Sequence, residues 1–243
     1  MRQLPLAMRL RERADFDSFV AGANETAVEQ LRACARGAAA GVAAGGRAGM
    51  YWLCGPPGSG KSHLLQATCT LTASTGATAL YLPLSQLLEL GALALEEWEP
   101  AAVVALDELQ VVAGRREWEQ ALFALYRAVE ERGAALIAAA PAPPALLPFS
   151  LPDLASRFGA AMLLALRPLD ESAQRRALQL RARARGLELP DDAALYLQRR
   201  FRRDLPTLCG LLDAIDSAAL QAQRRLTVPF IRAALGPPSR DAQ

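Results

Sequence analysis

A glycine-rich stretch of eight residues is the part of the sequence whose residue types and spacing most clearly predict chemistry. It fits the pattern G-x-x-x-x-G-K-S/T, follows a short apolar run and precedes a helical pattern. In such a loop, backbone N–H groups curl around phosphate oxygens, a lysine reaches the β- and γ-phosphates and a hydroxyl ligates Mg²⁺. The predicted phosphate site consists of Gly55, Pro56, Pro57, Gly58, Ser59, Gly60, Lys61 and Ser62.

Lys61 is also unusual in composition, because it is the single lysine beside 26 arginines. Genomic drift toward arginine explains the general excess of arginine. A compact ammonium, however, fits between two phosphates where a broad guanidinium does not. The composition is therefore consistent with a chemical role for Lys61, while coincidence stays open as the alternative.

Two carboxylates end an apolar run 46 residues after Lys61. Such a strand can place Asp107 in a Mg²⁺ shell and Glu108 where it polarises an attacking water. An acidic strand end is common by itself. Combined with the glycine-rich loop, it indicates a site for a nucleotide with Mg²⁺.

These groups need a scaffold that brings strand ends together. From Met50 onward, apolar runs without alternation are separated by helical patterns, which is typical of strands buried on both faces. The predicted strands are 50–54, 78–83, 101–106, 134–139 and 161–166, and the predicted helices are 61–74, 85–97 and 118–132. The pattern indicates an α/β fold with a five-stranded parallel sheet.

The pattern becomes entirely helical after Pro168. The predicted helices are 170–185, 191–201, 205–225 and a short one that starts at Thr227, with Pro229 in its first turn. We therefore expect an extended segment at 1–12, an α/β nucleotide-binding core at 13–167 and a helical lid at 168–243.

Composition excludes several classes of protein. With 52% hydrophobic residues the chain can bury a full core, and a net charge of +2 argues against a protein that coats nucleic acid. Prolines break the longest apolar run and arginines crowd the N-terminus, so we expect a soluble cytoplasmic protein without a membrane segment or signal peptide. The four cysteines lack the spacing of a zinc site or disulfide framework and are expected to be buried thiols.

The loop, the Asp–Glu strand and the helical lid together resemble the AAA+ ATPases, and finer features resemble their DnaA branch. Residues 15–24 (D-F-D-S-F-V-A-G-A-N) resemble the segment that precedes the core in DnaA-type proteins and helps frame the adenine. Residues 106–115 (L-D-E-L-Q-V-V-A-G-R) resemble the stretch around the Mg²⁺ strand. The resemblance implies an AAA+ core that binds ADP or ATP.

A helix-turn-helix domain of the DnaA type is not expected, because only eight residues follow Leu235. A DnaA-like core without that domain resembles the Hda family. The most specific pieces of this resemblance are residues 150–158, 177–183 and 226–230. It implies a negative regulator of replication initiation, with DnaA and the DNA polymerase sliding clamp as partners.

The Hda resemblance implies roles for two further groups. By position, Arg157 matches the arginine finger that enters the nucleotide site of ATP-bound DnaA; a surface salt bridge is the competing interpretation. The N-terminal sequence looks like the Q-L-x-L-x-L/M peptide that docks in the clamp's hydrophobic pocket, with an ordinary frayed terminus as the alternative. The residues of this match are Gln3, Leu4, Leu6 and Met8.

The chain departs from the family at both polar sensors. The fourth strand ends in Ala138-Ala139-Ala140-Pro141, which offers no side-chain donor, and Pro206 stands where the lid usually supplies an arginine. Substitution by Arg202 or Arg203 stays open. We therefore expect tight nucleotide binding with weak or no intrinsic ATPase activity.

Other functions remain as alternatives. An autonomous AAA+ ATPase that loads the replicative helicase would need turnover of its own, and a small nucleotide kinase leaves the lid and the Asp107–Glu108 pair unexplained. The arginine-rich lid is interpreted as a solvated face, with contact to the DNA backbone beside the clamp or to an acidic surface of DnaA as the alternatives. Self-association of the Hda kind is left open.

Overall fold

The structure is a computed structural model that describes residues 14–44, 49–95, 100–201, 207–212 and 226–235. The described residues form two compact units. The first contains residues 14–19, 24–56 and 60–166, and the second contains residues 20–23, 57–59 and 167–235. Each unit is described by itself.

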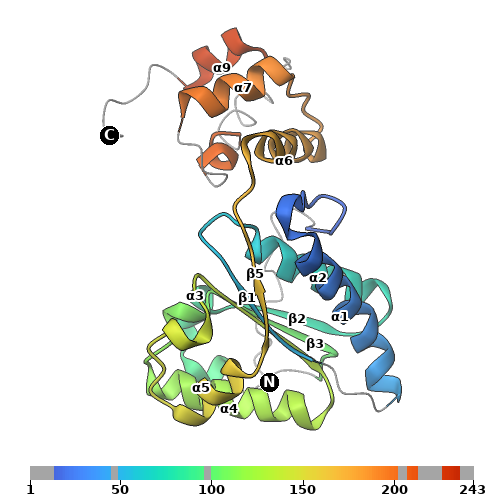
Figure 1. Cartoon of the computed structure of the whole chain (residues 1–243), viewed down its shortest axis with the longest axis vertical. Helices are drawn as coiled ribbons and strands as arrows, with labels where there is room; N and C mark the ends of the chain where they lie inside the picture. Colours follow the sequence, from blue (N-terminus) through green and yellow to red (C-terminus); the bar gives the residue numbers. More distant parts are fainter. Residues whose placement is uncertain (1–13, 45–48, 96–99, 202–206, 213–225, 236–243) are drawn as a thin grey trace. The chain divides into compact units, whose positions relative to one another are not determined.

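A five-stranded parallel sheet is the centre of the first unit (Figure 1). Its strand order is β2-β3-β4-β1-β5, so β1 lies between β4 and β5. The strands are β1 (Met50–Cys54), β2 (Ala79–Pro83), β3 (Val103–Asp107), β4 (Ala135–Ala140) and β5 (Met162–Ala165). All five predicted strands are confirmed, with ends that differ by two residues at most.

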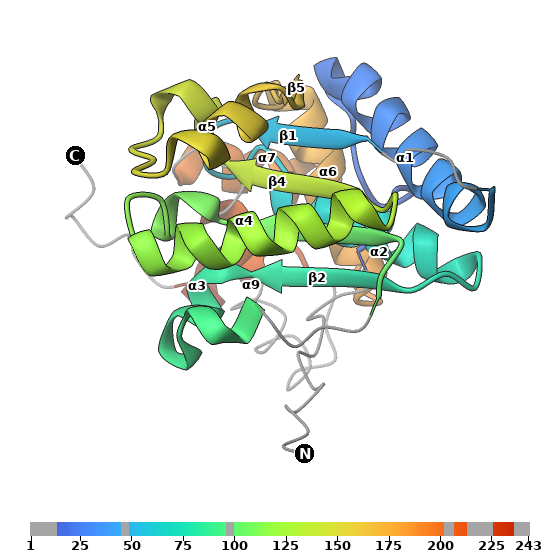
Figure 2. The same cartoon turned by 90° about the horizontal axis from the view of Figure 1, so that it is seen from below.

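Helices cover both faces of this sheet (Figure 2). One face packs against α1 (Glu25–Ala44) and α2 (Lys61–Ser74), and the other packs against α4 (Arg116–Glu131) and α5 (Pro152–Gly159). The 3₁₀ turns of the chain are η1 (Gly22–Asn24), η2 (Leu88–Leu90), η3 (Ala92–Leu95), η4 (Leu109–Val111) and η5 (Pro144–Leu146). The predicted helices 61–74 and 118–132 are confirmed.

The central strand β3 explains why its sequence is apolar without alternation. Val103 and Ala105 face the core under α1 and α2, whereas Val104 and Leu106 face the core under α4 and α5. Every residue of β3 and β4 is buried. A strand covered on both faces needs apolar side chains at odd and even positions alike.

The predicted helix 85–97 is wrong over its described part. The structure has a single turn, α3 (Leu84–Leu87), followed by η2 and then η3. Gly91, between the two 3₁₀ turns, has φ +78°. This left-handed conformation interrupts a helix, so the leucine spacing reflects packing of short turns rather than one continuous helix.

Every regular element described in the second unit is a helix or a 3₁₀ turn. It contains α6 (Glu171–Ala184), α7 (Asp191–Arg200), helical residues 207–212 and α9 (Val228–Leu235). Its core includes Leu178, Leu197, Leu208 and Ile231, all with no exposed surface. The predicted helices 170–185, 191–201 and the one from Thr227 are confirmed; most of the predicted helix 205–225 lies outside the described residues.

Two further features concern the whole described chain. None of its helices is both long and apolar enough to cross a membrane. Of the cysteines, Cys34, Cys54 and Cys209 are buried and Cys69 is partly buried, close to the expectation of buried thiols.

Candidate functional site

The glycine-rich loop connects the end of β1 to the first residue of α2. Gly60, directly before α2, has φ +95°, and a Cβ built there would lie 2.5 Å from Cε2 of Phe19. Backbone sterics and this close aromatic ring both require glycine at position 60. The loop conformation therefore follows from the sequence pattern that predicted it.

Lys61 extends back over this loop. Its Nζ donates hydrogen bonds to the carbonyl oxygens of Gly55 (2.7 Å) and Pro56 (3.0 Å). Partial burial lowers the pKa of the ammonium, and the nearby charges of Asp107 and Glu108 oppose that shift. A partly desolvated cation at the mouth of a glycine-rich loop is a strong site for an anion.

Ser59 supplies independent evidence for a ligand at this loop. The residue is only 4% exposed, and its hydroxyl finds no hydrogen-bond partner among the described residues. Buried hydroxyls are nearly always hydrogen-bonded, so an oxygen of a bound group would supply the hydrogen-bond partner that the Ser59 hydroxyl lacks. Ser62, in the first turn of α2, is exposed.

Asp107 and Glu108 lie at the carboxyl end of β3, at the same sheet edge as the end of β1. Asp107 is 3% exposed, and its two oxygens accept from the hydroxyl of Tyr81 (2.7 Å) and the backbone N–H of Glu108 (2.9 Å). The charges of both carboxylates oppose the lowering of the Lys61 pKa by burial, so the two groups lie within electrostatic range of the ammonium.

Glu108 has an unusual backbone. Its φ of +58° is the only positive value at a non-glycine residue in the described chain. Strained backbones of this kind gather at functional sites. The hydroxyl of Ser85, just after β2, donates to Oε2 of Glu108.

Tyr81 and Ser85 were not anticipated from the sequence. Both lie near the end of β2, which neighbours β3 in the parallel sheet. Since the carboxyl ends of adjacent parallel strands meet at one edge, polar residues at the end of the predicted strand 78–83 were the signal that could have found them.

The segment before the core packs against the start of α2. Nε2–H of His63 donates to the backbone oxygen of Asp15 (2.8 Å), and the rings of His63 and Phe19 lie 5.4 Å apart. Asp15 also accepts from the N–H of Ser18 (2.7 Å), and hydrogen bonds from Ser18 hold the pKa of Asp15 below its usual value. Residues 15–19 are thereby held beside the glycine-rich loop.

Arg157 lies in the last turn of α5, and its partners are on α4. Its guanidinium lies 5.7 Å from the centre of the Tyr126 ring, and its Nη1 lies 3.9 Å from Oε1 of Glu130. The Tyr126 hydroxyl donates to the same Glu130 oxygen (3.0 Å). The surface salt bridge is thus present, but it is long and the Arg157 side chain is 53% exposed, so the pair contributes little stability.

Several predicted groups lie outside the described residues. These are Gln3, Leu4, Leu6, Met8, Arg202, Arg203 and Pro206. At the end of β4, Ala138, Ala139 and Ala140 are fully buried and offer only methyl groups. The residues that end β4 therefore provide no side-chain hydrogen-bond donor.

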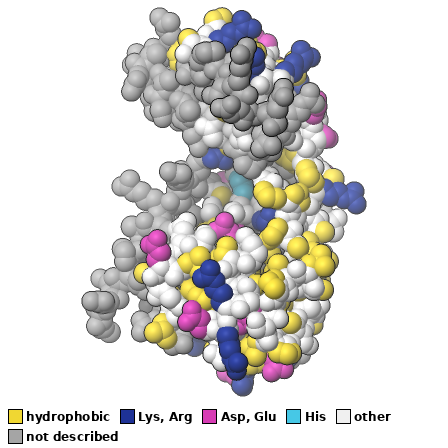
Figure 3. Space-filling model, turned by 90° about the vertical axis from the view of Figure 1, so that its left-hand side faces the viewer, with side chains coloured by type: hydrophobic (Ala, Val, Ile, Leu, Met, Phe, Trp, Pro, Cys, Tyr) yellow, Lys and Arg dark blue, Asp and Glu magenta, His cyan; other side chains and the backbone are white. Residues whose placement is uncertain are grey.

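The arginines of the lid are interspersed with acids. Arg175 pairs with Asp191 at 3.4 Å. On the face drawn in Figure 3, the described part of the second unit carries both basic and acidic side chains. This distribution favours the solvated-face interpretation.

The site fits a nucleotide with its metal ion. The loop shape, the desolvated ammonium of Lys61 and the unsatisfied Ser59 hydroxyl suit phosphate oxygens. The Ser62 hydroxyl and the Asp107 carboxylate are the oxygen donors that Mg²⁺ prefers.

Comparison with known proteins agrees with this geometry. Residues 170–235 match the family described as "Hda, lid domain". Domain III of DnaA from Thermotoga maritima has a TM-score of 0.72 at 17% identity, covering 91% of this chain and 95% of that one. DnaA from Aquifex aeolicus bound to AMPPCP gives 0.61 at 17% identity, covering 86% and 67%.

RuvB from Thermotoga maritima, a Holliday junction branch migration motor, has a TM-score of 0.60 at 17% identity, covering 91% of this chain and 71% of that one. At these identities the solved structures show the fold. The predicted fold, an α/β core with a five-stranded parallel sheet followed by a helical lid, is confirmed, and it is the fold of these DnaA and RuvB structures.

Proposed function

We propose that this chain, a DnaA-related AAA+ protein whose lid domain is of the Hda type, is a negative regulator of DNA replication initiation that acts in the cytoplasm. In this proposal it is an adaptor on the sliding clamp that stimulates hydrolysis of DnaA-bound ATP. The match of residues 170–235 to the Hda lid domain carries the proposal, because DnaA and RuvB share the fold and the fold alone does not separate their functions.

The chain's own nucleotide, ADP or ATP, is held by residues 55–62, with Ser62 and Asp107 as ligands of Mg²⁺. The DnaA structure bound to AMPPCP supports this assignment. Bound ATP supplies a phosphoryl group that water can attack. Glu108 is engaged by Ser85, and β4 ends in alanines, so intrinsic hydrolysis is weak.

Arg157 performs the stimulating step in the proposal. It is half-exposed, permanently charged and mounted on a helix whose Leu154 and Phe158 are buried. Leaving its long contact with Glu130, the guanidinium neutralises charge that develops on the γ-phosphate of DnaA-bound ATP. Arginine fingers contribute about 10³–10⁵ in rate elsewhere.

Residues Gln3, Leu4, Leu6 and Met8 are proposed to dock in the clamp as an extended peptide. In the proposal, residues 13–167 are the nucleotide-binding core and residues 168–243 the lid.

The decisive experiment mixes the protein with DNA-loaded clamp and ATP-bound DnaA and follows ADP formation. Wild type should accelerate hydrolysis, and Arg157→Ala should lower the stimulated rate about 10³-fold, leaving a small measurable residue. Arg127→Ala is the matched control, because Arg127 is an exposed arginine on α4 that pairs only with Glu131 at 3.3 Å among the described residues. Full activity of Arg157→Ala would overturn the finger assignment.

The clamp assignment is tested in the same assay by removing residues 1–8. The truncated protein should lose clamp-dependent stimulation and keep its nucleotide affinity. Unchanged clamp-dependent stimulation would refute the docking peptide alone.

An autonomous ATPase that loads the helicase is the second candidate, and the convergence of Lys61, Asp107 and Glu108 favours it. It requires steady-state ATP turnover by the isolated protein, stimulated by single-stranded DNA and absent in Lys61→Ala. Appreciable turnover of this kind would replace the adaptor proposal.

A further inference from the structure

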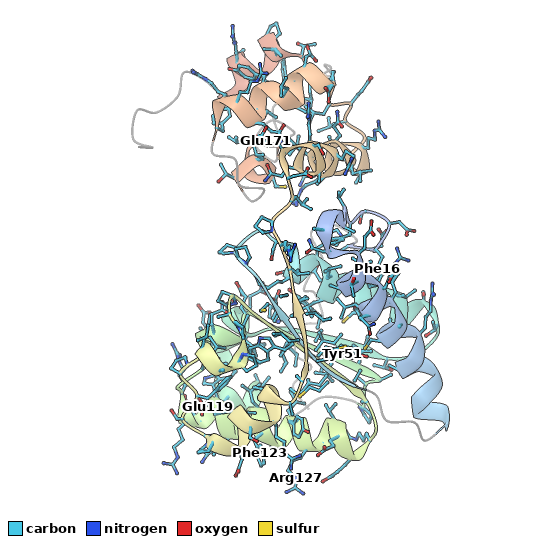
Figure 4. All side chains as sticks on the ribbon, viewed as in Figure 1. Phe16, Tyr51, Glu119, Phe123, Arg127 and Glu171 are labelled. Atoms are coloured by element: carbon cyan, nitrogen blue, oxygen red, sulfur yellow. The ribbon has the colours of Figure 1, made fainter. Side chains whose placement is uncertain are left out.

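Glu119 is a charged side chain with no exposed surface in the first unit. It lies near the start of α4 and is labelled in Figure 4. Its carboxylate accepts hydrogen bonds from three backbone N–H groups in two separate segments. These are Gly114 to Oε1 (2.7 Å), Ser150 to Oε1 and Oε2 (3.0 and 2.9 Å), and Leu151 to Oε2 (2.6 Å).

A carboxylate in the interior must be compensated, because desolvation of a charge is costly. At Glu119 the compensation comes from backbone donors that converge on both of its oxygens. The loop before α4 and the segment before α5 are thereby bonded to the same carboxylate, although Gly114 and Ser150 are 36 residues apart in the sequence.

The contact has a specific effect on α5. The N-cap residue of this helix is Leu151, which makes no side-chain capping hydrogen bond, and the next residue is Pro152. Glu119 therefore accepts from the N–H of the N-cap residue, which in a capping box is the role of a Glu or Gln at N3; in α5 that position is Leu154. The negative charge of Glu119 also lies at the positive end of the α5 dipole.

Arg157 depends on where α5 begins. The helix has eight residues, and Arg157 is six residues after Leu151, so a rise of about 1.5 Å per residue places it about 9 Å along the axis. Phe158 fixes the buried side of the helix against Trp52 and Phe149, at ring distances of 5.3 and 5.5 Å. A change at the Leu151 end therefore moves or tilts the turn that carries the guanidinium.

The other segment held by Glu119 leads back to the nucleotide site. Gly114 ends the loop that follows Asp107 and Glu108 through η4. Gly114 has φ +83°, and a Cβ there would lie 3.1 Å from the backbone oxygen of Pro148. The two segments are thus in close contact where Glu119 joins them.

We propose that Glu119 is the positioning residue for Arg157: its buried carboxylate fixes the start of α5 to the loop that follows Asp107 and Glu108. The activity part of this proposal rests on the proposed function of Arg157. The structural part rests on the geometry alone.

The activity test uses Glu119→Gln in the assay with clamp and ATP-bound DnaA. The amide is nearly isosteric, but it replaces one acceptor oxygen by an NH₂ group that faces backbone donors. The maximal stimulated rate should fall at least tenfold, while the concentration for half-maximal stimulation and the chain's own nucleotide affinity change less than threefold. Glu117→Gln, an exposed carboxylate on the same helix, should leave the rate unchanged.

A double variant separates positioning from a general structural effect. If Glu119 acts through Arg157, then Glu119→Gln adds no further loss to Arg157→Ala. Glu119→Asp, which keeps the charge on a shorter side chain, should recover part of the rate. A double variant well below Arg157→Ala, or Glu119→Gln as active as wild type, would overturn the proposal.

Amide hydrogen exchange supplies the structural test. The N–H groups of Ser150 and Leu151 should exchange slowly in wild type and in Arg157→Ala, and at least tenfold faster in Glu119→Gln. If Glu119→Gln does not fold, the same comparison is made with Glu119→Asp. Fast exchange of both amides in wild type contradicts the proposal. If wild type exchanges slowly but does not stimulate hydrolysis, the proposed function fails while the Glu119 contact stands.

Discussion

The hydroxyl of Tyr81 on β2 donates a 2.7 Å hydrogen bond to Oδ2 of Asp107 at the end of β3. The two strands are adjacent and parallel, and the other Asp107 oxygen accepts from the N–H of Glu108. Contacts within the protein therefore orient the carboxylate that is proposed to ligate Mg²⁺. The same contact affects the phenol, because burial and the charge of Asp107 raise the pKa of Tyr81.

This raised pKa predicts a loss of stability at high pH. Unfolded tyrosine ionises near pH 10.0, whereas folded Tyr81 keeps its proton to higher pH. The free energy of unfolding should therefore fall as pH rises above that value, until the folded phenol also ionises, by at most about 1.4 kcal/mol per pH unit. Urea unfolding at several pH values from about 8 to about 11.5 measures this fall in the free energy of unfolding. The range extends by roughly two pH units to either side of the reference pKa of tyrosine.

Tyr81→Phe should make the free energy of unfolding less dependent on pH in this range. Asp107→Asn should narrow the pH range over which that free energy falls, because it removes one of the charges that raise the pKa of the Tyr81 phenol. Equal slopes in wild type and Tyr81→Phe would show that the phenol is not the group responsible.

Lys61→Ala should abolish nucleotide binding. In wild type, ADP at about 100 times its dissociation constant should add about 2.7 kcal/mol to the free energy of unfolding, and in the variant it should add none. Lys61→Arg should also bind poorly, because the guanidinium is too broad for the loop. Thermal unfolding with and without ADP measures both.

Arg36→Ala is the control for charge, since Arg36 is exposed on α1 and its loss changes the net charge equally. Normal stabilisation of Lys61→Ala by ADP would contradict the assignment of the loop.

Ser85→Ala should raise the slow ATP hydrolysis of the isolated protein. The Ser85 hydroxyl donates a hydrogen bond to Oε2 of Glu108, and removal of this hydroxyl leaves that oxygen available to accept from an attacking water. A hydrogen bond to a charged group is worth about 1.5 kcal/mol or more, so an increase of about tenfold is expected, with unchanged nucleotide affinity. Single-turnover ADP formation measures it.

Ser74→Ala, at the exposed end of α2, is the matched control. A rate no higher than that of wild type would mean that Ser85 does not restrain Glu108.

Glu130→Gln should release Arg157 without destabilising the protein. The ion pair is long and half-exposed, so it contributes at most about 1 kcal/mol, and the stimulated hydrolysis of DnaA-bound ATP should rise by up to about fivefold. The clamp-dependent assay and urea unfolding measure the two effects. Glu131→Gln, which removes the equivalent pair with Arg127, is the control. A marked fall in stimulation would show that Glu130 holds the guanidinium in its active position.

Local sequence determined the phosphate loop and the sheet. Gly60, Lys61 and Ser62 are contiguous, and the loop conformation depends on glycine backbone freedom within that short stretch. The apolar runs predicted all five strands because burial on both faces of a parallel sheet requires such runs. Periodicity failed between Leu84 and Leu95, where Gly91 breaks the helix that the leucine spacing predicted.

Tertiary structure alone decided which side chains meet. The contact of Tyr81 with Asp107 depends on the pairing of β2 with β3, and the contact of Glu119 with Ser150 depends on the packing of α4 beside α5. Hydrogen bonds act over about 3 Å, so a spacing of 26 or 31 residues along the chain carries no information about them until the strands and helices are in place. The family resemblance indicates Arg157 as a candidate finger, whereas the contacts of the buried Glu119 carboxylate with the start of its helix are visible only in the folded chain.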